Sequence, residues 1–336
     1  MATVLPMIRA AAAAPLLRWL QEQGHPLDRL LKETGLTTLP LRDPMHPVPL
    51  LNTMSLLQKA ALLEGPDVSC RVVSETSTFE LLLLGKIALG AATPRDAMIR
   101  ISAAVPYFCT HEHLTIEPSA DGVIVHEFFA VPFPPDTLHL IHQYVAEMTR
   151  RLCSMAGAGE QALRHIEMTP HPEFGLEHLR PWFGDAIHPT RRRTLSIHID
   201  AGVIDTPFPS RARDRTAGKV PPGLASLRGD GTLKGSAAPL IADLLIEGTP
   251  TIEMLAELAG MSVRTLQRRL DMEGTSFSSL LDEVRRRIAV DRLASGKANV
   301  GTLSAELGYA RQASLTRAVR RWTGQSPRQL RLRGTG

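Results

Sequence analysis

The sequence predicts an α+β N-terminal domain followed by an all-α domain of two helix-turn-helix units joined by a long helix. Alternating apolar and polar residues predict strands among helices in residues 1–209, whereas only helical periodicity follows Ala237. Between these regions, residues 210–235 are rich in Gly, Pro, Arg and Ser and show no periodicity, which is typical of a linker. We therefore place the all-α domain at residues 236–333.

The N-terminal domain is predicted to combine a β-hairpin with several helices. Residues 113–119 and 122–131 alternate as strands around a turn that ends in Gly. Residues 137–155 have the apolar spacing of a helix packed on one side. Further strands are expected within residues 163–170 and 193–200, so the domain mixes helix and sheet.

Charge is distributed unevenly along the chain. Residues 1–210 carry 17 Lys and Arg against 22 Asp and Glu, a net charge of −5. Residues 211–336 carry 21 against 12, a net charge of +9. A basic C-terminal third favours a polyanionic partner such as nucleic acid, although a membrane surface would satisfy the same count.

Cysteine use and hydropathy bear on the compartment. The three cysteines, Cys70, Cys109 and Cys153, are widely spaced and form no CxxC motif, which fits a reducing compartment. No uninterrupted apolar stretch approaches the roughly 20 residues that span a bilayer. We therefore expect a cytoplasmic protein with no membrane partner.

The first helix-turn-helix unit is predicted at residues 251–273. Gly260 ends its first helix, and Ser262 can cap the second. The inner faces of the two helices carry Ile252, Leu255, Ala256 and Ala259, then Val263, Leu266 and Leu270. The outer face of the second helix carries Arg264, Thr265, Gln267, Arg268 and Asp271. Two helices joined by a short turn containing Gly are the helix-turn-helix arrangement.

The same pattern recurs at residues 300–323. Gly308 separates a helix that carries Leu303 and Leu307 from a second helix. The inner face of the second helix carries Leu315, Val319 and Trp322, and its outer face carries Arg311, Gln312, Ser314, Arg317 and Arg321. The repeat predicts a second helix-turn-helix unit.

Residues 276–295 predict the helix that joins the two units. At 1.5 Å per residue, about 18 helical residues span about 27 Å. Successive major grooves on one face of DNA lie about 34 Å apart, so such a helix can hold two recognition helices in adjacent grooves. The outer faces also suit base reading, because Arg bonds bidentately to guanine and Gln to adenine.

Two stretches carry a family resemblance: "AGMSVRTLQRRLDMEGTSFSSLLDEVRRRIAVDRLASG" from Ala259 and "ELGY…LTRAVRRWTGQSPRQLR" from Glu306. With them, residues 236–333 closely resemble the DNA-binding domain of the AraC/XylS family of transcription regulators. The resemblance implies double-stranded DNA as partner. It places the base-reading positions at Arg264, Gln267 and Arg268 in the first unit and near Gln312, Ala313, Ser314 and Arg317 in the second.

The second unit departs from the family at the start of its recognition helix. After "LGF" or "LGY" the family commonly has Ser followed by an acidic residue, where this chain has Ala310 and Arg311. A missing N-cap costs about 1 kcal/mol. A cation at a helix N-terminus is disfavoured by the helix dipole unless a phosphate lies nearby, so we expect this unit to be weaker or tuned toward phosphate contact.

Phosphate contacts are expected from hydroxyls near a helix N-terminus and from further arginines. The candidates are Ser262, Thr265, Arg311, Arg320 and Arg321. For the arginines, plain solvated charge is the alternative interpretation. The run Arg285 to Arg287 in the joining helix is interpreted as a solvated face, with Asp282 and Glu283 available for local pairing.

The stretch "FGDAIHPTRRRTLSIHIDAGVIDTPFP", residues 183–209, carries a second resemblance. It is similar to the arabinose-binding-type sensor domain of family members that regulate amino-acid catabolism or virulence. The resemblance implies a small-molecule effector of unknown identity, a homodimer and an activator that works with RNA polymerase.

Other interpretations stay open for the N-terminal domain. It could serve only to dimerise or to bind a protein partner, without a ligand. It could also carry a redox-sensing thiol at Cys109, or be an enzyme fused to the DNA-binding domain. The sequence has no GxSxG, GxxxxGK or GxGxxG motif, so we predict no enzyme and no cofactor. His111 and His113 alternate as on one strand face, but no further ligands complete a zinc set.

Overall fold

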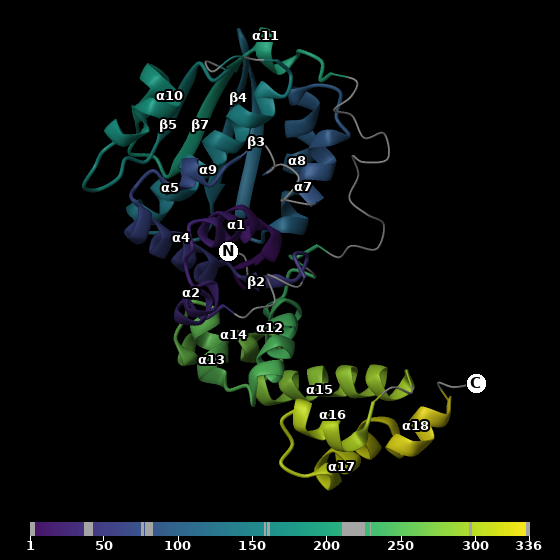
Figure 1. Ribbon diagram of the computed structural model, residues 1–336. Coiled ribbons are helices and arrows are strands. Elements are labelled where there is room, and N and C mark those ends of the chain that lie inside the picture. Colours follow the sequence, from purple (N-terminus) through teal and green to yellow (C-terminus); the bar gives the residue numbers. More distant parts are fainter. Residues whose placement is uncertain are drawn as a thin grey trace. The chain divides into compact units, whose positions relative to one another are not determined.

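The computed structural model describes residues 4–36, 43–74, 77, 83–157, 159, 162–209, 226–228, 230–295 and 298–333. The chain forms two compact units (Figure 1). The N-terminal unit comprises Pro6–Leu227, and the C-terminal unit comprises Arg228–Gly336 together with Met1–Leu5. Most of the predicted linker, residues 210–225 and 229, lies outside the described residues.

The N-terminal unit contains a five-stranded sheet of order β3-β4-β7-β5-β6. All pairings are antiparallel except that between β5 and β6. Its strands are β3 (Glu112–Ser119), β4 (Gly122–Phe129), β5 (His165–Met168), β6 (Ile187–Pro189) and β7 (Thr194–Asp200). The predicted hairpin and both later strands are therefore confirmed, because period-2 patterning fits a sheet with one covered face.

Gly122 is required where the hairpin turns. A Cβ atom at this position would lie 2.1 Å from the carbonyl oxygen of Ile199 on the neighbouring strand β7. Only a residue without a side chain allows the two backbones to approach this closely.

Two helices cover one face of the sheet, α8 (Pro94–Phe108) and α9 (Pro135–Ser154). Every second residue of β4, such as Val123 and Val125, is buried against them. The predicted helix at 137–155 is confirmed as α9. The remaining face of α9 packs toward a second hydrophobic core formed by the helices that precede α8.

This second core holds the start of the N-terminal unit. The antiparallel strands β1 (Met7–Arg9) and β2 (Pro47–Pro49) pair within it. The helical segments around them are η1 (Ala10–Ala13), α1 (Ala14–Glu22), α2 (Leu27–Glu33), α4 (Leu50–Glu64), α5 (Val68–Arg71) and α7 (Leu83–Leu89). The short segments η2 (Glu177–Leu179), α10 (Arg180–Phe183), η3 (Gly184–Ala186) and α11 (Ala201–Ile204) complete the unit.

The described part of the C-terminal unit has helices as its only regular elements. They are α12 (Leu233–Glu247), α13 (Ile252–Leu258), α14 (Val263–Met272), α15 (Phe277–Ala294), α16 (Val300–Glu306), α17 (Gln312–Thr323) and α18 (Pro327–Arg333). In Figure 1, α12 to α14 gather near the start of α15, and α16 to α18 pack along it. The molecule thus mixes helix and sheet in the first unit and is all-helical in the second, as the periodicity predicts.

Across the helices that the structure describes, none is long and apolar enough to cross a membrane.

Candidate nucleic-acid interface

The helix pair α13–α14 is specified by local sequence. The Thr251 hydroxyl accepts a hydrogen bond from the Met254 N–H at 3.3 Å and caps α13. The turn between the helices uses Gly260 in the left-handed region, at φ 62°. The Ser262 hydroxyl then accepts from the Thr265 N–H at 3.2 Å, so the predicted cap of α14 is confirmed.

Helix α14 has one buried and one exposed face. Leu266 and Leu270 are buried, as the spacing predicts. Arg264, Gln267 and Arg268 are exposed on the other side, and their side chains bond to no other residue that the structure describes. The three predicted base-reading side chains of the first unit are thus brought together on one open helix face, where they can reach a ligand without giving up an internal partner.

The helix pair α16–α17 repeats this plan with a different start to its second helix. Asn299 caps α16 by accepting from the Gly301 N–H at 2.7 Å. Gly308 turns the chain at φ 68°. Arg311 occupies the N-cap position of α17 and makes no side-chain capping bond. The missing cap predicted from the sequence is therefore confirmed.

Helix α17 also divides into two faces. Leu315 and Val319 are completely buried, whereas Gln312 and Arg317 are exposed and Ser314 is half-buried. Ala313 and the phosphate candidates Arg311 and Arg320 are exposed as well. The candidates of the second unit therefore lie away from its apolar face, as in the first.

Arg321 already has a partner. Its Nη2 donates to both carboxylate oxygens of Asp282 on α15, at 2.7 and 2.9 Å. The indole Nε1 of Trp322 donates to the same carboxylate at 2.8 Å. Asp282 thus ties the C-terminal half of α17 to the joining helix, a role that sequence reasoning missed because the two segments are far apart along the chain.

Arg285 is not the solvated charge expected from the sequence. Its Nε donates to the Leu307 carbonyl at 2.8 Å, and its guanidinium lies 4.8 Å from the Tyr309 ring centroid, a cation–π contact. The local pairing expected of Asp282 and Glu283 is also wrong, because Asp282 binds Arg321. Glu283 pairs with Lys234 at 2.9 Å. All three residues thus make contacts with distant segments: Arg285 with the turn before α17, Asp282 with α17 and Glu283 with α12.

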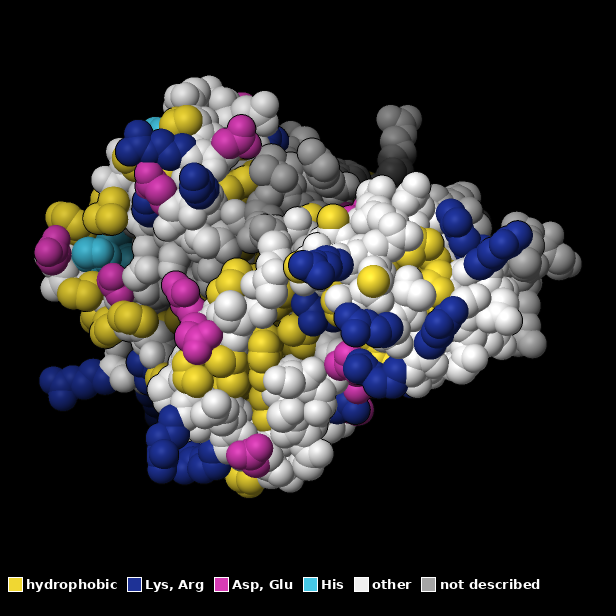
Figure 2. All heavy atoms as spheres, turned by 90° about the horizontal axis from the view of Figure 1, so that it is seen from below, with side chains coloured by type: hydrophobic (Ala, Val, Ile, Leu, Met, Phe, Trp, Pro, Cys, Tyr) yellow, Lys and Arg dark blue, Asp and Glu magenta, His cyan; other side chains and the backbone are white. Residues whose placement is uncertain are grey.

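Basic side chains gather over this part of the molecule. Figure 2 shows a group of Lys and Arg side chains in the right half of the view, where α15 to α18 lie. Arg286 and Arg287 of α15 are exposed, as the sequence predicts. Such a surface attracts a polyanion.

The clusters and the burial of the described side chains in the N-terminal unit bear on metal binding and on thiol chemistry. Across the described residues, no cluster of His, Cys, Asp and Glu could hold a metal ion. All three cysteines are buried and free. Burial raises the pKa of the Cys109 thiol far above its ordinary value and that of Cys153 to about 12, whereas a redox-sensing cysteine needs a lowered thiol pKa.

Known proteins that are similar to this chain are also helix-turn-helix proteins. The helix-turn-helix domain family matches residues 255–333. VirS, an HTH-type transcriptional regulator of Mycobacterium tuberculosis, is 38% identical over 288 residues, which cover 82% of this chain and 81% of VirS. Rv1395, an uncharacterized HTH-type transcriptional regulator of the same organism, is 25% identical over 327 residues, or 93% of each protein.

One solved structure aligns over most of the chain. The crystal structure of the transcriptional regulator CdpR from Pseudomonas aeruginosa covers 94% of this chain and 98% of its own. It shares 19% sequence identity at a TM-score of 0.39.

The helix pairs, the matched helix-turn-helix family and the similarity to VirS define a DNA-binding transcription regulator and not an enzyme. The chain belongs to the AraC-type family of helix-turn-helix transcriptional regulators.

Proposed function

We propose that α14 and α17 are the recognition helices of two helix-turn-helix units, at about 251–273 and 300–323, that read adjacent major grooves. The observation that carries the proposal is the division of each helix into a buried apolar face and an exposed polar face. The base-reading residues would be Arg264, Gln267 and Arg268 in the first unit and Gln312, Ser314 and Arg317 in the second.

The joining helix has a length that suits this task. Helix α15 has 18 residues, or about 27 Å at 1.5 Å per residue. Together with the widths of the flanking helices, this length suits the groove repeat of about 34 Å. Each recognition helix would then meet its own half-site.

Phosphates would be held by Ser262, Thr265, Arg311, Arg320 and Arg321. Arg311 stands at the N-terminus of α17, where a phosphate would relieve the unfavourable placement of its charge. The Ser262 and Thr265 hydroxyls lie 2.9 Å apart at the start of α14, beside backbone N–H groups that suit an anion. Arg321 would have to leave the Asp282 carboxylate in order to bind a phosphate.

The N-terminal unit would regulate DNA binding through a small molecule. We infer an effector-gated activator that forms a homodimer and works with RNA polymerase, on the strength of the family resemblance. Gating requires two states of the protein that bind the effector with different affinity. A regulator without a ligand, which uses this unit only to dimerise or to bind a protein, is the second candidate.

The DNA-reading proposal is tested by binding to duplexes that contain both half-sites or one half-site scrambled. We expect protection of two patches about 10–11 base pairs apart, and an affinity that falls steeply with salt because phosphate contacts release counterions. Protection of a single patch would reduce the second helix pair to a structural role. An affinity independent of salt would contradict DNA binding by this basic surface.

A further inference from the structure

The N-terminal unit contains an apolar pocket of about 170 Å³ between its two hydrophobic cores. Helices α4, α7, α8 and α9 supply most of its described lining, and strands β3 and β4 contribute from the sheet. A pocket with apolar walls, at the meeting point of several elements, is the usual form of a small-molecule site.

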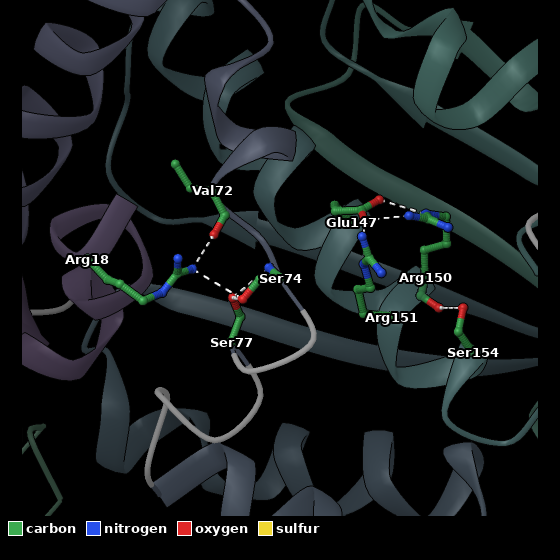
Figure 3. Close-up of polar contacts among 8 residues, drawn as sticks. All are labelled: Arg18, Val72, Ser74, Ser77, Glu147, Arg150, Arg151 and Ser154. Carbon is green, nitrogen blue, oxygen red and sulfur yellow. Dashed lines mark hydrogen bonds and ion pairs between the residues drawn. The ribbon is translucent and has the colours of Figure 1, made fainter. Parts of the chain in front are cut away.

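Helix α9 presents an apolar face to the pocket. Its lining residues are spaced so that they lie on one side of the helix: Ile141, Tyr144, Val145, Met148, Thr149 and Leu152. The buried carboxylate of Glu147, on the same helix, accepts hydrogen bonds from Arg150 and Arg151 at 2.6 to 2.9 Å (Figure 3). None of these three charged residues belongs to the described lining, so this acid and its two cations are paired outside the pocket.

The wall that α1 contributes is held by a polar contact. Arg18 of α1 donates from Nη2 to the Val72 carbonyl at 3.1 Å and to the Ser74 hydroxyl at 3.2 Å (Figure 3). Leu16 and Val72 both line the pocket. Because this contact ties α1 to the segment after α5, the pocket has a defined wall on this side.

The polar groups in the described lining are the hydroxyls of Thr53, Tyr144 and Thr149 and the carboxyl group of Glu112. The Thr53 hydroxyl donates to the Pro49 carbonyl at 3.0 Å. Desolvation raises the pKa of the Glu112 carboxyl to about 7, which favours its uncharged form. The pocket therefore offers a ligand mostly hydrocarbon contacts and a few hydroxyl groups.

Neither sign of charge is favoured in a ligand at this site. No Lys, Arg or His belongs to the described lining, so an anionic head would lose its hydration without gaining a cationic partner. A cationic head would compete with existing contacts, because Glu112 already interacts within the chain. The nearby carboxyl group of Glu127, opposite Leu114 in the sheet, faces the buried His142 imidazole, with Oε2 3.8 Å from Nε2. An uncharged ligand avoids both costs.

The lining can also adapt to the shape of a ligand. Met54, Met98 and Met148 all line the pocket. Methionine side chains are unbranched and flexible, so they fill irregular space and rearrange around different apolar bodies. The pocket can therefore receive either a ring or an alkyl chain.

We propose that this pocket binds a small, uncharged, mostly hydrocarbon molecule that carries at most one hydroxyl or carbonyl group. The inference rests on the proposed effector gating and names its site and ligand class. An apolar cavity of about 150 Å³ holds benzene, so the ligand has roughly six to ten non-hydrogen atoms.

Three probes with one chain and different heads test the ligand class on the full-length protein. Hexan-1-ol, hexylamine and hexanoate are compared by isothermal calorimetry and by thermal shift. We expect the alcohol to bind at least about tenfold more tightly than either ion, because an ionised head has no partner in the pocket. Binding of either ion as tight as that of the alcohol, or no binding of the alcohol, would overturn the proposal.

A series of alcohols tests whether the pocket is the site. Affinity should rise about fourfold for each added methylene up to about octan-1-ol, and decan-1-ol should bind no more tightly because the pocket is then full. Leu57 lines the pocket, so Leu57→Ala should enlarge it and make decan-1-ol bind about 4- to 16-fold more tightly than octan-1-ol.

Leu56→Ala is the matched control, because Leu56 is the preceding residue of α4 and is completely buried, but does not belong to the described lining. This variant should keep the wild-type ratio of decan-1-ol to octan-1-ol affinity. If Leu57→Ala does not fold, Met54→Ala, at a half-buried lining position, takes its place. A ratio that changes equally in the lining variant and the control, or in neither, would overturn the proposed site.

The DNA affinity of the alcohol-loaded protein separates this inference from the gating proposal. If the alcohols bind with the expected dependence on chain length and the affinity for the operator is unchanged, the site stands and gating by this ligand class fails. If operator affinity changes with the alcohols in the same order as their binding, both proposals are supported.

Discussion

The two helix pairs of the C-terminal unit have the same plan but are stabilised in different ways. In α13–α14, the cap of the second helix is a local bond between Ser262 and Thr265. In α16–α17 the corresponding cap is absent. Instead, Asp282 ties α17 to α15, and Arg285 of α15 holds the turn that precedes α17. The comparison teaches that a recognition helix can lose its local start signal when distant contacts hold it.

The largest expected effect is on DNA binding, and it distinguishes residues that read bases from residues that contact phosphates in the two helix pairs. Arg268→Ala should weaken binding to the operator by about 1–3 kcal/mol and change binding to random DNA little. Arg317→Ala should have the smaller sequence-specific effect, because its pair has the start suited to phosphate contact. Fluorescence anisotropy with both duplexes measures this, and equal losses on both duplexes for Arg268→Ala would assign that residue to phosphate.

The next effect concerns the turn of the second pair. Gly308→Ala should destabilise the protein by more than the roughly 1–2 kcal/mol of a left-handed non-glycine residue. Its Cβ would lie 3.1 Å from both Arg285 Nη2 and Thr249 Oγ1. Gly274→Ala, at φ 69° with nothing within 4 Å of the new Cβ, is the matched control in the same unit. If urea unfolding gives equal losses of unfolding free energy for the two variants, the turn at Gly308 can shift enough to accommodate the added Cβ atom.

Removing the cap of α14 and supplying a cap to α17 should change the stability of the protein in opposite directions. Ser262→Ala should lower the free energy of unfolding by about 1 kcal/mol, and Arg311→Ser should raise it by a similar amount by supplying the missing cap. If Arg311 also holds a phosphate, Arg311→Ser should reduce the salt slope of DNA binding by about one. A stabilised variant with an unchanged slope would leave Arg311 as solvated charge.

The smallest expected effect concerns the tie between α15 and α17. Asp282→Asn should cost only about 0.2–1 kcal/mol, because the Arg321 and Asp282 side chains are 64% and 41% exposed. The loss should shrink at high salt, and Trp322 fluorescence should report the change. Asp291 is an exposed residue of the same helix, and Asp291→Asn should change neither the free energy of unfolding nor the Trp322 fluorescence.

Features set by neighbours in sequence could be predicted and were found. The hairpin around Gly122, the cap at Ser262 and the buried positions Leu266 and Leu315 all follow from periodicity or from bonds a few residues long. The absence of a cap at Arg311 could also be predicted from the sequence. These features depend on backbone geometry and side-chain spacing within one element, so no long-range information is needed.

Contacts between distant segments could not be predicted. Glu273 at the end of α14 accepts hydrogen bonds from the N–H groups of Leu233 and Lys234 at the start of α12, at 2.7 and 2.9 Å. Arg285 was expected to be solvated, and its contacts with Leu307 and Tyr309 depend on how α15 lies against the following turn. Each polar group had several possible partners along the sequence, and only packing selects one.

By itself, the sequence determined the two fold classes, the repeated helix pairs and the exposed Arg and Gln positions, because hydrophobic periodicity decides which face of an element is buried. The tertiary structure decided which charges are structural and which are open to a ligand. It also formed an apolar pocket in the N-terminal unit, whose described lining comes from segments spread over about 140 residues, from Ile8 to Leu152. Such a pocket exists only where the side chains of distant segments leave space between them, and no local sequence pattern predicts which segments pack together.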